Sequence, residues 1–173
     1  MSENKSMLKM RPNLMTMLSE AQTWVHEHKK EGVICPCCKA KIKVYKRKLN
    51  STMMLFLIAL NKLDRRKPND IYFHVKEILQ VAGAGRSVGL DYCILKHYRF
   101  IEAMGKDEED TTKKTSGYWK ITERAKQFLS GKIKVPSHVF TFMENKFSGF
   151  SDELIGPLDA IDNHFDFEEL MNQ

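Results

Sequence analysis

Apolar residues recur three or four positions apart in several segments, which is the spacing of one face of an α-helix. Residues 13–32 show this pattern, with Asn13 as a suitable N-cap and Gly32 as a suitable stop. Residues 51–63 are apolar almost all round and follow a capping residue, Ser51, so we expect a helix at the centre of the fold. Further helices are expected over 74–81, over 87–99 and after Thr122.

Alternating apolar and polar positions predict strands between these helices. Residues 33–45 end in the alternating run KIKVY, which predicts a small hairpin with a cysteine-rich turn. A short strand is expected over 71–73. Residues 100–104 and 117–121 read as the two strands of a hairpin, joined by the polar loop 105–116. Another hairpin is expected within 135–147.

The order of elements predicts an α+β fold whose core is a winged helix-turn-helix. In that fold a helix, a turn and a second helix precede two strands, and the loop between the strands is the wing. We divide the chain into a flexible basic tail (1–12), an N-terminal helix with a Cys-containing β-hairpin (13–50), the winged-helix core (51–131), and a small C-terminal β/α extension of a hairpin and an acidic terminal segment (132–173).

Charge is distributed unevenly along the chain. The formal net charge is +6, but residues 151–173 contain seven acids and no Lys or Arg. The first 150 residues therefore carry 28 bases against 15 acids. The excess of bases in the first 150 residues favours a polyanionic partner, most simply nucleic acid. The alternative is a charged surface that only keeps the protein in solution.

The expected helix over 87–99 has two faces on a wheel of about 100° per residue. Leu90, Ile94 and Tyr98 would face the core, whereas the opposite side would present donors to a DNA groove. The wing and the strand after the cysteines would add contacts to phosphates. Acidic residues in the wing would oppose such contacts, and lysines on an exposed strand also protect a sheet edge. The predicted nucleic-acid-binding residues are Arg86, Ser87, Tyr92, Lys96, Arg99, Lys113, Lys114, Lys41, Lys43, Lys46, Arg47 and Lys48.

Cys35 and Cys38 have the spacing of a zinc knuckle, in which one tight turn supplies two thiolates. A structural zinc ion needs four ligands, and the predicted set is Cys35, Cys38, His26 and His28. Cys93 and His97 are a second source of ligands. The alternative is a metal-free turn with ordinary thiols, in which His28 only packs.

Several runs resemble small phage-encoded winged-helix proteins, most of which have no known function. The resemblance covers residues 30–170 and implies a winged-helix fold and a phage or mobile-element origin, but no ligand. It is carried by Cys35-Pro36-Cys37-Cys38, Lys46-Arg47-Lys48-Leu49, the run GYWKIT at 117–122, Ala125, Phe128-Leu129, Gly131, Val135-Pro136 and Phe165-Asp166-Phe167.

The sequence thus predicts a non-enzymatic nucleic-acid-binding protein, with DNA favoured, in a regulatory role. No phosphate-binding loop or hydrolase motif is present, and no secretory signal begins the sequence. The longest apolar run has eight residues, too few to cross a bilayer, so we expect a cytoplasmic protein. The alternative is a phage-encoded inhibitor or adaptor of a host polymerase or defence nuclease. A homodimer would form through residues 13–30, and the acidic terminal segment would be autoinhibitory or partner-binding.

Overall fold

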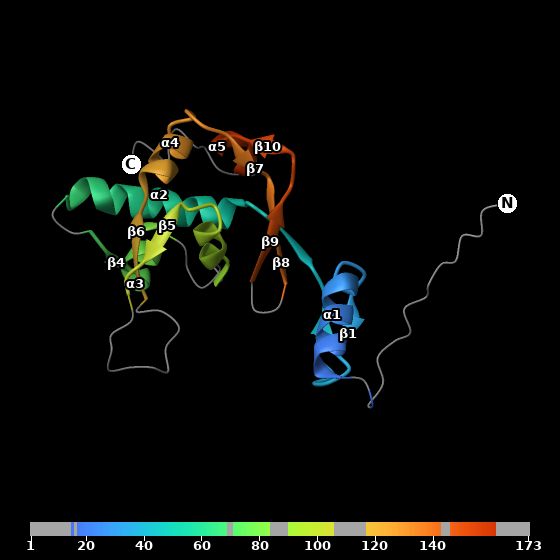
Figure 1. Cartoon of the computed structure of the whole chain (residues 1–173). Helices are drawn as coiled ribbons and strands as arrows, with labels where there is room; N and C mark the ends of the chain where they lie inside the picture. Colours follow the sequence, from blue (N-terminus) through green and yellow to red (C-terminus); the bar gives the residue numbers. More distant parts are fainter. Residues whose placement is uncertain are drawn as a thin grey trace. The chain divides into compact units, whose positions relative to one another are not determined.

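The chain has an α+β fold of helices and small antiparallel sheets (Figure 1). The computed structural model describes residue 15 and residues 17–68, 71–83, 90–105, 117–142 and 146–161. The predicted basic tail, most of the wing and most of the acidic terminal segment lie outside these residues. The chain divides into two compact units. Unit 1 is Met1–Lys46 with Phe140–Ser148, and unit 2 is Arg47–Val139 with Gly149–Gln173. The boundaries of these units differ from the predicted domain boundaries at residues 50 and 131.

Unit 1 contains one helix and a short hairpin. α1 (Leu18–His28) buries Ala21 and Val25, four residues apart on one face. β1 (Val33–Ile34) and β2 (Lys41–Ile42) pair antiparallel, with the cysteines in the turn between them. The predicted hairpin is therefore confirmed. The predicted N-cap at residue 13 lies outside the described residues, and α1 starts after Met17, whose side chain makes no capping bond.

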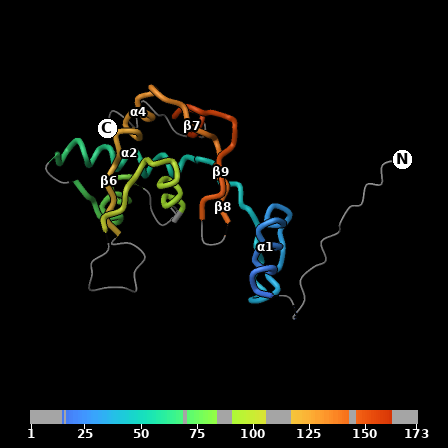
Figure 2. The backbone as a smooth tube through the Cα atoms, viewed as in Figure 1, coloured from blue at the N-terminus to red at the C-terminus, as the bar shows by residue number. Residues whose placement is uncertain are grey.

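The central element of unit 2 is α2 (Ser51–Arg66). Asn50 caps it by accepting a hydrogen bond from the backbone N–H of Met53 at 3.1 Å, so the expected cap at Ser51 is wrong by one residue. Most residues of α2 are buried, and the helix contacts β6, η1 and helices α3, α4 and α5. Figure 2 shows how these elements surround it. A helix that is apolar on every side is stable in water only when covered in this way.

A three-stranded sheet packs beside α2. The chain continues through β4 (Phe73–His74), α3 (Val75–Val81), the 3₁₀-helix η1 (Leu90–Lys96), β5 (Ile101–Ala103) and β6 (Tyr118–Ile121). The strand order is β4-β6-β5, and both pairings are antiparallel. Trp119 of β6 lies opposite both Phe73 and Ala103. The predicted pairing of the strands around residues 100–104 and 117–121 is confirmed.

The start of β6 depends on a glycine. Gly117 has φ +78°, and a Cβ atom there would lie 3.2 Å from Nε2 of His74. His74 in turn caps α3 by accepting from the N–H of Lys76, and its ring packs edge-on against Tyr118. The close approach of β4 and β6 at this end therefore requires both the left-handed backbone and the missing side chain of glycine.

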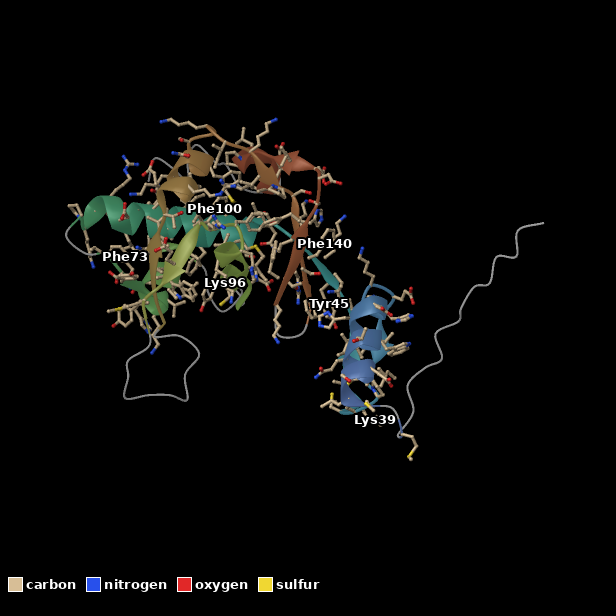
Figure 3. All side chains as sticks on the ribbon, in the orientation of Figure 1. Lys39, Tyr45, Phe73, Lys96, Phe100 and Phe140 are labelled. Atoms are coloured by element: carbon tan, nitrogen blue, oxygen red, sulfur yellow. The ribbon has the colours of Figure 1, made fainter. Side chains whose placement is uncertain are left out.

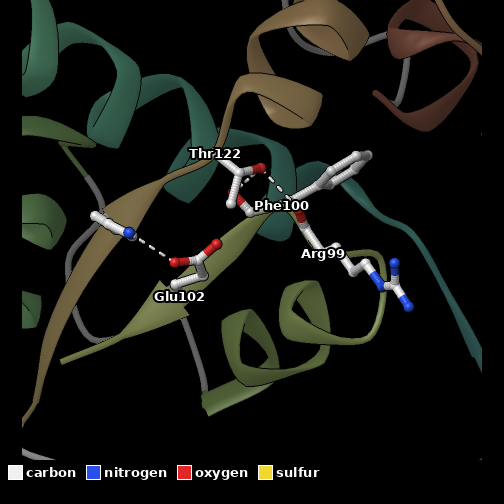
Figure 4. Close-up of polar contacts among 5 residues, drawn as sticks. Arg99, Phe100, Glu102 and Thr122 are labelled. Carbon is white, nitrogen blue, oxygen red and sulfur yellow. Dashed lines mark hydrogen bonds and ion pairs between the residues drawn. The ribbon is translucent and has the colours of Figure 1, made fainter. Parts of the chain in front are cut away.

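The β6 strand leads directly into α4 (Glu123–Leu129) through Thr122. The Thr122 hydroxyl accepts from the N–H of Ala125, as the sequence predicts for an N-cap. It also lies 2.7 Å from the Arg99 carbonyl, to which it donates (Figure 4). Below this junction the rings of Phe100 and Phe128 stack with centroids 4.9 Å apart. One threonine side chain thus joins the start of α4 to the start of β5.

The remaining strands lie near the end of the described chain. β7 (Val135–Pro136) pairs with β10 (Leu154–Ile155), and α5 (Pro157–Ala160) follows. β3 (Tyr45–Lys48), β8 (His138–Phe142) and β9 (Lys146–Phe150) form a sheet in the order β3-β8-β9. The chain passes between the two units within these three strands. All four residues of the edge strand β3 are exposed.

Replacing Thr122 with alanine removes the N-cap of α4 and the bond to the Arg99 carbonyl together. We expect the free energy of unfolding to fall by about 1–2 kcal/mol in urea denaturation. Thr122→Ser keeps the hydroxyl and is the matched control, with a loss of less than about half that amount. Equal losses in the two variants would show that the methyl group, and not the hydroxyl, matters.

Candidate functional site

Of the recognition helix expected over 87–99, residues 90–96 form the 3₁₀-helix η1, with about 120° per residue, and Tyr98 and Arg99 lie in the turn that follows it. Residues three apart therefore share a face, and the wheel of about 100° used for an α-helix does not apply. Tyr92, Leu95 and Tyr98 form the buried face, together with Ile94. Lys96 and Arg99, also three apart, are exposed.

Tyr92 is a core residue, and its predicted role as a nucleic-acid contact is wrong. Its side chain is 8 % exposed and stacks on Phe56 at 4.5 Å between ring centroids. The edge of a second ring, Trp119, lies 5.8 Å away. Burial raises the pKa of the Tyr92 phenol to about 12. This side chain anchors η1 to α2 and cannot reach a ligand on the outer surface.

Lys96 at the end of η1 and Arg99 in the turn after it are exposed positive charges. Neither has an ion-pair partner among the described residues, and Figure 3 shows Lys96 on this helix. Other bases of unit 2 are already engaged. Lys120 pairs with Glu102 at 2.7 Å, and Lys126 pairs with Asp64 at 2.7 Å. Within the part of the chain that the structure describes, no carboxylate engages Lys96 or Arg99.

Arg99 has an unusual backbone conformation. Its φ is +58°, in the left-handed region that costs a residue with a side chain roughly 1–2 kcal/mol. The conformation turns the chain from η1 into β5. Its N–H donates to the Lys96 carbonyl at 3.0 Å, and its own carbonyl accepts from Thr122. The guanidinium points away from this junction (Figure 4).

The other predicted contacts are separated from Lys96 and Arg99 in the chain. Arg86, Ser87, Lys113 and Lys114 lie outside the described residues, so the structure does not place them. The remaining five predicted bases are exposed on β2, on β3 and in the segment between them: Lys41, Lys43, Lys46, Arg47 and Lys48. Those up to Lys46 belong to unit 1, whereas Lys96 and Arg99 belong to unit 2.

The turn between β1 and β2 places two backbone amides on one sulfur. Sγ of Cys35 accepts from the N–H groups of Cys38 and Cys37, and these bonds lower the pKa of the Cys35 thiol. Lys39 closes the turn with φ +61°, and its N–H donates to the Cys35 carbonyl. By contrast, burial raises the pKa of Cys37, with a further contribution from the Cys35 charge. The turn therefore favours a thiolate at Cys35.

The four predicted zinc ligands do not come together in the described structure. His28 stacks on Trp24, and its Nδ1 lies 2.8 Å from the Trp24 carbonyl. His26 packs edge-on against Phe142 instead. Within the described residues no three His, Cys, Asp or Glu side chains are placed to hold one metal ion. The described residues therefore do not bring the four predicted ligands together as a zinc site.

The second predicted source of ligands, Cys93 and His97, spans the end of the 3₁₀-helix, because Cys93 lies within η1 and His97 follows its last residue. Zinc binding by this chain remains a prediction.

A polar cluster that the sequence did not reveal lies between β7, β8 and the residues after β9. The Ser137 hydroxyl donates to Glu153 at 2.6 Å and lies 2.7 Å from Nδ1 of His138 and 3.1 Å from the Ser151 hydroxyl. Serine, histidine and a carboxylate are the residue types of a hydrolase triad. Here, however, the Ser137 side chain is 2 % exposed, and its hydroxyl donates a hydrogen bond directly to the Glu153 carboxylate. The cluster therefore holds chain segments together, and Ser137 is not an accessible nucleophile.

Comparisons with protein families, with curated proteins and with solved structures found no match for this chain. Among the described residues, none of the helices combines the length and apolarity that crossing a membrane requires.

The contrast between Cys35 and Cys37 predicts different alkylation rates in the folded protein. Between the lowered pKa of Cys35 and the raised pKa of Cys37, the first is a thiolate and the second a thiol. We expect iodoacetamide to modify Cys35 first, as measured by peptide mass spectrometry, with an advantage that shrinks as the pH rises. In urea the difference should disappear, because the amides no longer face the sulfur. Faster modification of Cys37 in the folded protein would contradict the geometry of the turn.

Proposed function

We propose that this protein is a non-enzymatic nucleic-acid-binding protein, with DNA favoured, and that residues 51–131 form a winged helix-turn-helix. The single observation that carries the proposal is a pair of exposed cations, Lys96 at the end of η1 and Arg99 in the turn after it, which have no ion-pair partner among the described residues, while the other side of η1 is anchored in the core. A regulatory role in a host cytoplasm, for a protein of phage or mobile-element origin, follows only from the family resemblance.

The topology of unit 2 supports the winged-helix part of the proposal. A winged helix places three helical segments before and between the strands of an antiparallel three-stranded sheet, with the first strand beside the last. The sequence of α2, β4, α3, η1, β5 and β6 has this order, and the sheet runs β4-β6-β5. The connection between β5 and β6, the wing of such a fold, contains Lys113 and Lys114.

We expect Lys96 and Arg99 to bind mainly the phosphates of DNA. An ammonium and a guanidinium bind phosphate oxygens through charge-assisted hydrogen bonds, and the guanidinium can bind two at once. Such contacts release counterions from DNA and make affinity fall steeply with salt. Arginine side chains also read guanine in a major groove, so base contacts by Arg99 are compatible with the same surface.

A protein partner is the second candidate function, and two exposed leucines at the end of the described chain favour it. Leu154 of β10 is 56 % exposed and Leu158 of α5 is 66 % exposed. Apolar side chains of this kind favour an inhibitor or adaptor acting on a host polymerase or defence nuclease. In that case DNA affinity would not depend on Lys96 and Arg99.

The double variant Lys96→Ala/Arg99→Ala tests the interface. We expect DNA affinity, measured by fluorescence anisotropy with a short duplex, to fall at least about tenfold at low salt. The slope of log K against log salt should become shallower by about 2, since each phosphate contact contributes roughly 0.9.

Lys132→Ala/Lys134→Ala is the matched control, because both lysines are exposed in unit 2 and follow α4. It removes the same charge from the same unit and should change the slope by less than half as much. Equal effects of the two double variants would reduce the proposal to nonspecific attraction by net charge.

Arg99 allows stability and binding to be separated. Arg99→Gly removes the guanidinium but suits the left-handed backbone, so the free energy of unfolding should stay constant or rise by up to about 1 kcal/mol. Arg99→Ala removes the same charge but keeps the strain. Both variants should lose DNA affinity equally, while only the glycine variant gains stability relative to the alanine variant in urea. Full DNA affinity in either would remove Arg99 from the interface.

A further inference from the structure

A cavity of about 620 Å³ opens in unit 1 between α1 and the cysteine hairpin. This volume is in the range of small-molecule sites. Its apolar walls come from Ala21, Val25 and Ile42, all of which are buried. Cys35 and Cys37 line it from the turn. A cavity with walls of this kind can take the apolar body of a small molecule out of water.

The polar lining of the cavity contains two lysines beside neutral Gln22 and the Cys35 and Cys37 thiols, so its cations outnumber the single thiolate that the turn favours at Cys35. Lys29 of α1 and Lys146 of β9 line it, together with His26, and no carboxylate belongs to its described lining. The Nζ atom of Lys29 lies 4.6 Å from the centre of the Phe142 ring, and the His26 ring approaches the same phenyl group at 5.8 Å. Phe142 thus fixes two of the basic side chains beside the apolar wall.

We propose that this cavity binds a small amphipathic anion, whose apolar body lies against Val25 and Ile42 and whose acidic head binds Lys29 and Lys146. Two ammonium groups without a carboxylate attract a carboxylate, a sulfonate or a phosphate. The apolar walls distinguish this site from an open basic surface, which would bind a polyanion without enclosing it. The proposal does not depend on DNA binding, because its residues all belong to unit 1.

The full-length protein can be tested with two fluorescent probes that share an apolar body. 1-Anilinonaphthalene-8-sulfonate carries an acidic head, and N-phenyl-1-naphthylamine has none. We expect saturable binding of the sulfonate at least tenfold tighter than binding of the neutral probe. In Lys29→Gln/Lys146→Gln the preference for the sulfonate should disappear while the neutral probe binds unchanged. Lys30→Gln, which removes an exposed charge next to Lys29 but outside the cavity lining, should keep the preference.

Competition identifies the source of the anion, and octanoate, octyl phosphate and deoxyadenosine monophosphate are the competitors. Displacement by either octyl compound supports a lipid-like ligand, and displacement by the mononucleotide supports a nucleotide. A bound competitor should also slow alkylation of Cys37, which lines the cavity, but not of Cys38, which does not. The proposal is overturned if no competitor displaces the sulfonate, or if Lys30→Gln removes the preference for the sulfonate as fully as the double variant does.

Discussion

The burial of α2 is the constraint on which the rest of unit 2 depends. A helix with apolar side chains all round must be covered on every side, because any open side would expose them to water. The sheet, η1, α3 and α4 supply that cover. Tyr92 contributes by stacking on Phe56, and Phe100 and Phe128 stack at the junction with α4. The direction in which Lys96 and Arg99 face follows from this packing, since the opposite side of η1 is committed to the core.

The sequence predicted those elements whose signals are local. The apolar pattern of α2, the cap at Thr122 and the pairing of β5 with β6 depend on neighbouring residues or on one short connection. The orientation of Tyr92 could not be predicted in this way, because it depends on whether the segment winds with about 3 or about 3.6 residues per turn. Packing against α2 determines the number of residues per turn, and this packing cannot be predicted from a single sequence.

The candidate sites show the same limit. Cysteine spacing revealed the turn, but whether His26 and His28 join it depends on which aromatic ring each one packs against, Phe142 or Trp24. The cavity could not be predicted from the sequence, because its lining combines α1 and the hairpin with strands that lie more than one hundred residues after α1. Ser137 and Glu153 are likewise brought together by the pairing of β7 with β10. The sequence pattern of two such short strands does not predict that they pair.

The edge strand β3 has a consequence for how copies of this protein meet. In the strand order β3-β8-β9 it stands at one edge, and the edge of a sheet is the usual starting point for strand-to-strand aggregation. Lys46, Arg47 and Lys48 are all exposed there, so a second copy approaching in the same way would bring like charges together. Salt screens that repulsion. Concentrated preparations should therefore stay free of fibrous or amorphous assemblies more readily in dilute buffer than in high salt.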